Sequence, residues 1–578
     1  MPNMPVADVN LNALWCRCIA EELVRSGVQF VVLCPGSRNS PLIFALTAQP
    51  GLTCLGHVDE RSAGFIALGL ARANDHRVAV CVTSGSAVAN LLPALAEAHA
   101  AELPLIVISA DRPWEAQDCG APQAMPQRGI FASFAAALDL GEPLATANAL
   151  CSLRARVSRI IQTDHAPVHI NVPLRDPLPP LPDPAWSTPP LPEDALRGRS
   201  DSEPFTTCCR ATTAPDLPSY PWLKPGLKGL IVAGSTGRRH PDVSVMELAR
   251  ATGWPLLADV ASGLRRSGLP ELITSADALC LGPLAAERPE LIVQIGPVPL
   301  SRSLYEWLGK QDCPWISVES QTDQDWLHRA WVSVQGQPGA ALTAIATRCA
   351  PGNIWWKERW LSAERQARAR LDTALLSEPW NELSAVHRAL NHPGFRFLHC
   401  ASSMAIRLAN LLAQVQDRPV FANRGLNGID GTLGTFLGEC LAQPGEPGLL
   451  MTGDLAMLHD LPALAAVSQA PSCGPRPVLA PRGALVVLNN HGGAIFDHLP
   501  VSQVPGYERW IRANHDLDFA HIAAQFSCGY RKVTDVATLD AALDDASEAD
   551  RKTLLLIECL LPAGGVERFR GMQKRLTD

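Results

Sequence analysis

The chain has 578 residues, of which 47% are hydrophobic and 18% are charged, and its formal net charge is -8. This length exceeds what one hydrophobic core supports, so about three or four domains are expected. An acidic balance argues against a nucleic-acid surface, which usually carries a basic stripe. No apolar run approaches the roughly 20 residues that span a bilayer. The N-terminal residues also lack the pattern of a secretory signal, so we expect a cytoplasmic protein without a membrane span.

The 17 cysteines are scattered through apolar segments and form no CxxC pair, so most are expected to be small buried side chains. Cys16 and Cys18 are two apart, and Cys208 and Cys209 are adjacent, but neither spacing is a usual zinc-ligand pattern. An anionic substrate would have to be bound by local arginines, because the chain as a whole is acidic.

Three α/β blocks follow one another, each with short Val/Ile/Leu-rich runs that alternate with helical stretches. This pattern predicts doubly wound parallel sheets covered on both faces. The first block covers residues 1–185, with a helix at Ser86–His99 and strands at Val28–Cys34, Val78–Val82, Leu105–Ser109 and Val168–Val172. The second covers 227–350, with strands at Gly229–Val232, Leu256–Asp259, Leu291–Ile295 and Trp315–Val318. The third covers 380–578 and closes with a strand at Thr553–Cys559.

Two proline-rich stretches separate or interrupt these blocks. Residues 186–226 begin within PLRDPLPPLPDPAWSTPPLPED and are predicted to be a linker, because proline removes a backbone donor and fixes φ. The segment SQAPSCGPRPVLAPRG, between Ser468 and Gly483, is predicted to be a surface loop inserted in the third block.

The third block contains a candidate site for a metal ion and a diphosphate. In GLLMTGDLAMLHDLPAL a strand ends at a glycine turn with Asp454, and in ALVVLNNHGGAIFDHL a strand ends at Asn490 and two glycines. Ligands bind at the carboxyl ends of the strands of such sheets. Asp454, the Asn490 side chain and the Gly492 carbonyl are oxygen donors suited to Mg²⁺. The alternative is that Asp454 only caps a helix.

Glu60 lies directly before a helix in GHVDERSAGFIALGLARA and has two possible roles. A glutamate at this position commonly caps the helix. Alternatively, the small apolar residues around it would partly desolvate the carboxylate, raise its pKa and suit it to proton exchange with a heterocycle.

Loops after other strands of the first block carry candidate anion-binding side chains. Ser37 and Arg38 in LCPGSRNSP directly precede a helix, and Arg112 in SADRPWEAQDCGAPQA is placed similarly. Such an arrangement can bind a carboxylate. The alternative is that both arginines are solvated or tie loops together.

Motifs along nearly the whole chain resemble those of the 2-succinyl-5-enolpyruvyl-6-hydroxy-3-cyclohexene-1-carboxylate (SEPHCHC) synthases, the thiamine-diphosphate-dependent transferases of menaquinone biosynthesis. The matching segments, in the family's order, are CPGSRNSP, HVDERSAGFIALGLA, AVCVTSGSAVANLLPALAEA, ISADRP, DCGAPQA, FANRGLNGIDG, TGDLAMLHDLPAL and LNNHGGAIFDHLP. The linker, much of the middle block and the proline-rich insert match weakly.

The resemblance implies a pyrimidine-binding domain, a central domain without cofactor and a diphosphate-binding domain, with active sites between the subunits of a homodimer or a dimer of dimers. Glu60 would bind N1′ of the cofactor's pyrimidine, and Ile429 would hold the cofactor bent. Asp454, Asn490 and the Gly492 carbonyl would hold Mg²⁺, with Mn²⁺ as an alternative ion. The implied reaction decarboxylates 2-oxoglutarate and adds the resulting succinyl carbanion to isochorismate.

The family's substrate-binding positions map onto eleven residues of this chain: Ser37, Arg38, Arg112, Gln123, Arg302, Ser403, Arg407, Arg424, Ile495, Phe496 and Leu499. Five arginines in this set would supply the positive field that carboxylate substrates need. Pro122 stands where the family often has Asn, which puts substrate orientation in question. Near Arg302 the family often has Lys, so the positive charge persists with a different geometry.

Nearby histidines and other classes of protein give alternative interpretations. His57, His459, His491 and His498 fall near the proposed site, but proximity alone favours structural roles for them. A different thiamine-dependent decarboxylase or ligase would use another acceptor. A catalytically silent relative would be expected to lack Glu60, Asp454 or Asn490. A dinucleotide-binding dehydrogenase is disfavoured because no GxGxxG motif follows a strand.

Overall fold

The computed structural model describes residues 9–163, 166–184, 186–187, 190–209, 220–235, 243–297, 299–319, 324–335, 338–469, 472–475, 480–548 and 553–577. The chain forms two compact units. One comprises residues 1–210, 430–445 and 460–481, and the other comprises residues 211–429, 446–459 and 482–578. None of the described helices is long and apolar enough to cross a membrane.

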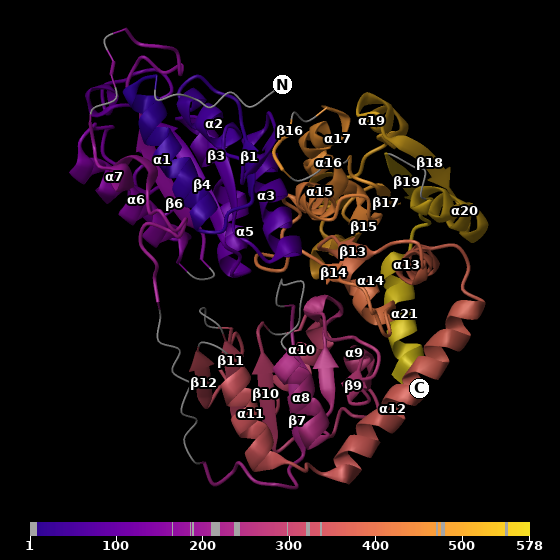
Figure 1. Ribbon diagram of the computed structural model, residues 1–578. Coiled ribbons are helices and arrows are strands. Elements are labelled where there is room, and N and C mark those ends of the chain that lie inside the picture. The colour runs from indigo at the N-terminus through magenta and orange to yellow at the C-terminus, as the bar shows by residue number, and fades with distance from the viewer. Residues whose placement is uncertain are drawn as a thin grey trace. The chain divides into compact units, whose positions relative to one another are not determined.

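The first unit is built on one sheet (Figure 1), whose strand order is β16-β2-β1-β3-β4-β6-β5. Its strands are β1 (Phe30–Leu33), β2 (Thr53–Gly56), β3 (Val78–Val82), β4 (Leu105–Asp111), β5 (Ala136–Asp139), β6 (Val168–Pro173) and β16 (Ser472–Cys473). Its helices are α1 (Leu11–Arg25), α2 (Ser40–Thr47), α3 (Glu60–Asn74), α4 (Ser86–Ala89), α5 (Leu92–Ala100), α6 (Ala147–Ile161), α7 (Glu193–Arg197), α15 (Thr432–Ala442) and α17 (Ala465–Gln469). Every strand pair is parallel except β16 with β2.

The second unit contains two six-stranded parallel sheets. The order of the middle sheet is β12-β11-β10-β7-β8-β9, made of β7 (Gly229–Ala233), β8 (Leu256–Ala258), β9 (Leu272–Ile273), β10 (Leu291–Ile295), β11 (Trp315–Glu319) and β12 (Val332–Gln335). Its helices are α8 (Val243–Thr252), α9 (Ala276–Leu279), α10 (Arg302–Leu308), α11 (Pro338–Cys349) and α12 (Ile354–Leu376).

The C-terminal sheet has the order β14-β13-β15-β17-β19-β18. Its strands are β13 (Phe397–Cys400), β14 (Val420–Phe421), β15 (Gly448–Gly453), β17 (Gly483–Asn489), β18 (Gly529–Val533) and β19 (Leu554–Leu560). Its helices are α13 (Glu382–Asn391), α14 (Met404–Leu412), α16 (Asp454–His459), α18 (Tyr507–Trp510), α19 (Phe519–Gln525), α20 (Val536–Ser547) and α21 (Gly565–Thr577). Short 3-10 turns, among them η4 (Ala494–His498), complete it.

Strand burial explains why these segments form central parallel strands. Every residue of β3, β4, β7, β10 and β17 is buried, as expected for strands covered on both faces. The predicted α/β class with three parallel sheets is therefore confirmed. In both the first and the C-terminal sheet the strand order reverses, between β1 and β3 and between β13 and β15 respectively. Ligands bind at such reversal points, beyond the carboxyl ends of the strands.

Three local predictions differ from the structure. The helix predicted at Ser86–His99 is two helices, α4 and α5, and Pro93 lies in the first turn of the second. Part of the predicted linker is folded: α7 buries Ala195, whose carbonyl accepts a hydrogen bond from Arg154. The insert predicted as a loop contributes β16, which pairs antiparallel with β2, so it adds an edge strand to the first sheet.

A segment between β14 and β15 belongs to the first unit, where α15 packs along α3 (Figure 1). Gly69 of α3 lies against the Thr435 backbone, and Gly438 of α15 lies against the Ile66 backbone, so neither position has room for a Cβ. Buried Arg72 of α3 lies 3.8 Å from Glu97 and 3.5 Å from Glu439 of α15. Glycine contacts and buried charge therefore fix the register of these two helices.

Candidate active site

In the second unit, the turn after β15 and the turn after β17 meet at Asp454. This carboxylate is 2% exposed. Its Oδ1 accepts a hydrogen bond from Leu455 N at 2.7 Å, and its Oδ2 accepts from Asn490 N at 3.2 Å and Gly492 N at 2.9 Å. Asp454 therefore does more than cap a helix, the alternative that the sequence left open, because it also joins the ends of two strands. His515 Nε2, which the sequence did not single out, lies 3.3 Å from the same Oδ2.

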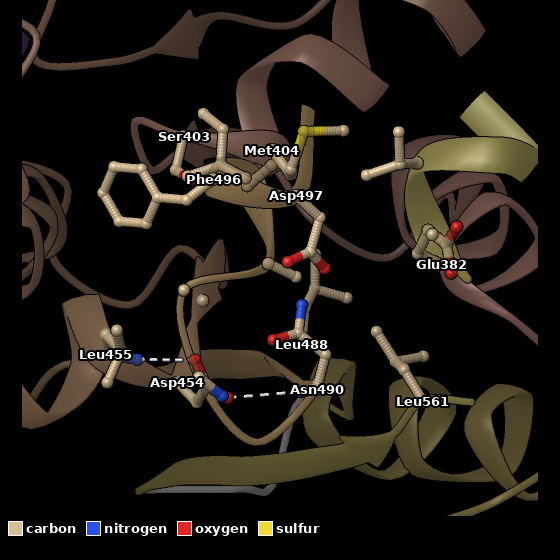
Figure 2. Close-up of a pocket in the computed structure, with 18 of the residues that line it drawn as sticks. Glu382, Ser403, Met404, Asp454, Leu455, Leu488, Asn490, Phe496, Asp497 and Leu561 are labelled. Carbon is tan, nitrogen blue, oxygen red and sulfur yellow. Dashed lines mark hydrogen bonds between the residues drawn. The ribbon is translucent and has the colours of Figure 1, made fainter. Parts of the chain in front are cut away.

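The Asn490 side chain lies beside this carboxylate (Figure 2). Its Oδ1 is buried and accepts no hydrogen bond from the described residues. Buried polar oxygens are nearly always satisfied, so an orphaned amide oxygen beside a buried carboxylate indicates a missing ligand. Gly492 has φ +143°, and a Cβ there would lie 2.7 Å from Arg512 O, so the turn requires glycine. By contrast, a Cβ on Gly453 would meet no atom of the described chain, which leaves open space above the end of β15.

A cavity of about 330 Å³, which we call the Asp454 cavity, opens at these turns. Figure 2 shows Asp454 and Asn490 together on one side of it, with Ser403, Met404 and Phe496 on another. The predicted residues that line it are Ile429, Ser403, Arg407, Asp454, Asn490, Gly492, Ile495 and Phe496. Eight residues predicted from distant parts of the sequence are thus brought to one cavity.

A second cavity of about 440 Å³, the Arg302 cavity, is lined by Arg302 and Leu499. It shares Arg407, Ile495 and Phe496 with the Asp454 cavity, as well as Met404 and His498. Arg302 Nε donates to Glu306 Oε1 at 2.7 Å, and Arg407 Nη1 donates to Ser403 O at 2.7 Å. Ser403 itself has φ +72° and is the N-cap residue directly before α14, so its backbone is strained at the cavity wall.

Electrostatics distinguish the arginines of the second unit. Burial, and secondarily the charge of Arg424, lowers the pKa of Arg407. Arg424 lines neither cavity, but its charge acts on Arg407 and on buried Asp259. Burial raises the pKa of Asp259 to about 6, and the charge of Arg424 opposes that rise. These two guanidinium groups therefore lie close enough to repel each other, and a bound anion would relieve that repulsion.

The remaining predicted residues lie in the first unit. Glu60 is the first residue of α3, but the cap is Asp59, whose Oδ2 accepts from Ser62 N at 3.0 Å. The capping interpretation of Glu60 is therefore wrong. The Glu60 Oε2 accepts a bond from Asn90 Nδ2 at 3.3 Å, a partner that the sequence did not indicate. The Glu60 side chain is partly buried, and the residue follows shortly after the end of β2.

Arg38 and Arg112 form a second pair of neighbouring cations. Arg38 is 8% exposed and its Nη1 donates to Leu174 O at 2.9 Å and Asp176 Oδ2 at 3.1 Å, while Arg112 Nη2 donates to Pro122 O at 2.6 Å. Burial, and then the charge of Arg38, lowers the pKa of Arg112. The Nε of each is buried and has no hydrogen-bond partner among the described residues. Both arginines tie loops, as the alternative held, yet each keeps an unused donor.

Ser37 and Gln123 are exposed in the same unit. Gln123 has φ +52°, and its backbone lies 3.0 Å from where a Cβ on Gly85 would be, so the loop after β3 approaches it closely. Gln127, a residue that the sequence did not indicate, fixes this contact because its buried Oε1 accepts a hydrogen bond from Gly85 N at 2.8 Å. No spacing or composition signal marks this glutamine.

The four histidines that the sequence singled out occupy different environments. His57 is buried, and burial lowers its pKa; its Nδ1 contacts the Asp59 backbone, a structural role. His459 and His491 are exposed. His498 lines both cavities, and burial followed by the charges of Arg570 and Arg407 lowers its pKa. Both guanidinium groups therefore act on the imidazole of His498.

Family models and full-length relatives agree on the identity of the chain. Residues 16–132 match the N-terminal binding domain of thiamine pyrophosphate enzymes, and residues 208–393 match the middle domain of such enzymes. A SEPHCHC synthase of Roseiflexus castenholzii is 34% identical over 94% of this chain and 95% of its own length. That of Myxococcus xanthus is 37% identical over 90% of each chain, and that of Synechococcus elongatus is 35% identical over 93% of this chain and 92% of its own. The chain therefore belongs to the SEPHCHC synthase family of thiamine-diphosphate-dependent transferases.

Proposed function

We propose that this chain decarboxylates 2-oxoglutarate and adds the succinyl group to isochorismate, using thiamine diphosphate and Mg²⁺ or Mn²⁺. The observation that carries the proposal is the Asp454 cavity, where a buried carboxylate and an orphaned amide oxygen meet at the carboxyl ends of β15 and β17. Full-length similarity to SEPHCHC synthases supports the choice of substrates.

The donor set fits a hard cation that also binds a diphosphate. Among the described residues no group of three or more His, Cys, Asp or Glu side chains is placed to hold a metal ion. The proposed protein ligands are one carboxylate oxygen of Asp454, Oδ1 of Asn490 and the Gly492 carbonyl. Mg²⁺ typically binds one or two carboxylates and completes its octahedron with phosphate oxygens and water. The open space beside Gly453 leaves room for those phosphate oxygens.

The protein's remaining work is to hold protons and orient reactants. When bound, the cofactor supplies an electron sink for the charge left by decarboxylation. Glu60 would hold a proton at N1′ of the pyrimidine, a role consistent with a partly buried carboxylate that Asn90 orients. Ile429 would press the cofactor into its bent form from the wall of the Asp454 cavity.

The paired arginines would bind substrate carboxylates. The charge of Arg424 acts on Arg407 in one unit, and that of Arg38 acts on Arg112 in the other, so a carboxylate bound at either place would offset the like charges. Ser37, Gln123, Arg302 and Ser403 would add polar contacts, while Ile495, Phe496 and Leu499 would supply apolar ones. Holding two reactants in one orientation removes a large entropic barrier.

We also propose a homodimer or a dimer of dimers with active sites between subunits, on the family resemblance. Light scattering coupled to size-exclusion chromatography measures the assembly. Location in the cytoplasm stays a prediction.

The function is tested by Glu60→Gln, which keeps the shape of the side chain but removes its negative charge. We expect isochorismate consumption to fall at least about 100-fold, the scale of a general acid–base contribution. The circular dichroism spectrum and melting temperature should be unchanged. Glu193→Gln, on the exposed face of α7, is the matched control and should keep full activity. Activity of Glu60→Gln close to wild type would remove Glu60 from the mechanism.

A further inference from the structure

Arg570 on α21 lines the Arg302 cavity, although neither its position in the sequence nor any motif singles it out. Three residues of this helix, Phe569, Arg570 and Gln573, form one wall of the cavity. The helix is held in place independently of the cavity: Val566, Met572 and Leu576 are buried, and Arg568 makes a bidentate pair with Glu382 at 2.8 and 3.1 Å. Its cavity-facing side chains are therefore presented from a fixed support.

The positive charge of Arg570 has no carboxylate partner among the described residues. Its one hydrogen bond in the structure joins Nη2 to the backbone carbonyl of His498, at 3.2 Å. Neighbouring arginines differ from it: Arg302 is paired with Glu306, and Arg568 is paired with Glu382. A guanidinium offers five N–H donors, so Arg570 keeps donors for a further acceptor.

The other ionisable groups of the cavity leave its positive charge uncompensated. They are Asp277, Arg302, Glu306, Arg407 and His498. Glu306 is used by Arg302. Asp277 accepts from Asn410 Nδ2 at 3.1 Å, and burial raises its pKa, which weakens it as a counter-charge. The charges of Arg570 and Arg407 lower the pKa of His498, while those of Asp497 and Glu567, which do not line this cavity, act in the opposite direction.

We propose that Arg570 binds a substrate carboxylate in the Arg302 cavity, together with Arg407, and so sets substrate affinity. This inference rests on the proposed function, because that function supplies the carboxylate substrates. Two guanidinium groups that line one cavity and have no carboxylate partner among the described residues suit an acid with a carboxylate remote from its reacting carbon. Both 2-oxoglutarate and isochorismate carry such a group, and the experiment separates them.

The test measures kcat and KM for each substrate, with the other saturating, in wild type, Arg570→Gln and Arg570→Lys. For Arg570→Gln we expect the KM of one substrate to rise on the order of 10- to 100-fold while kcat stays within about threefold, the signature of lost uniform binding. Arg570→Lys should recover part of that loss, because it keeps the charge but not the forked geometry. Lys574→Gln is the matched control: it removes one positive charge from an exposed position on the same helix and lines neither cavity, so both KM values should stay unchanged.

An analogue identifies which carboxylate is bound. If the KM for 2-oxoglutarate rises, 2-oxopentanoate, which ends in a methyl group, should be used equally well by wild type and Arg570→Gln. If the KM for isochorismate rises, that for 2-oxoglutarate should stay constant.

Unchanged KM values for both substrates would overturn the inference while leaving the proposed function intact. A fall in kcat and melting temperature with constant KM would also overturn it, because it would show that Arg570 only holds the His498 turn. A wild-type enzyme that consumes neither substrate would remove the proposed function and this inference together.

Discussion

Replacing Asp454 with Asn removes the single carboxylate of the proposed metal site and disturbs the turns that it joins. Oδ1 accepts from one backbone N–H and Oδ2 from two. An amide can accept at only one of these positions, so its NH₂ group must face at least one N–H donor. A hydrogen bond to a charged group contributes about 1.5–3 kcal/mol, and we expect unfolding free energy to fall by a similar amount. A lost charged ligand of this size should weaken Mg²⁺ binding on the order of 100-fold.

The assay is a titration of activity with Mg²⁺ at saturating cofactor, with urea unfolding of the cofactor-free protein measured alongside. Asp312→Asn removes an exposed carboxylate and serves as the control. If the half-saturating Mg²⁺ concentration of Asp454→Asn equals that of wild type, Asp454 is no metal ligand. If stability alone falls, the carboxylate only joins the two turns.

Three further predictions concern the proposed diphosphate space at Gly453, the contact between α3 and α15, and the pH dependence of stability. Gly453→Ala should change the unfolding free energy by no more than about 0.5 kcal/mol but weaken thiamine diphosphate binding, because the added Cβ enters only the proposed diphosphate space. Binding would be measured by fluorescence titration, and unaltered binding would argue against that placement. Arg72→Met should lower the unfolding free energy by about 3–5 kcal/mol in urea, since it removes the buried guanidinium that lies beside the carboxylates of Glu97 and Glu439, whereas Arg197→Met on the surface should have little effect. Burial raises the pKa of Asp460 to about 6. The folded state therefore binds more protons than the unfolded state between about pH 4 and 6, so its stability falls as the pH rises. When the pH is raised from 4.5 to 7, the unfolding free energy of wild type should fall by about 2 kcal/mol more than that of Asp460→Asn. Parallel stability–pH curves for the two proteins would contradict this.

The sequence predicted the strands well where burial on both faces leaves a continuous apolar run. The expected bounds at Val78–Val82 and Leu291–Ile295 are those observed, and Val168–Val172 is one residue short. Predictions failed where a local signal was overridden by packing. The proline-rich insert contains a strand because β2 offers an open edge, and no local pattern announces that pairing.

The ends of the predicted strands and the sequence motifs indicated the residues of the candidate site. They did not indicate the residues that support those side chains. Asp454, Asn490 and Gly492 each follow a buried strand, so their meeting could be expected from the topology of parallel sheets. His515, Asn90 and Gln127 come from segments whose contacts arise only in the folded chain. Glu60 was assigned two roles from the sequence, and the hydrogen bond from Ser62 N to Asp59 shows that the neighbouring residue caps the helix.

The most direct test of the central claim is a turnover assay in which thiamine diphosphate, Mg²⁺, 2-oxoglutarate and isochorismate are each omitted in turn. Isochorismate loss would be followed spectroscopically and the product identified by mass. We predict that the succinylated cyclohexene adduct and CO₂ form only when all four components are present. Release of CO₂ without consumption of isochorismate would contradict the assigned acceptor, and absence of any reaction would contradict the proposed function as a whole.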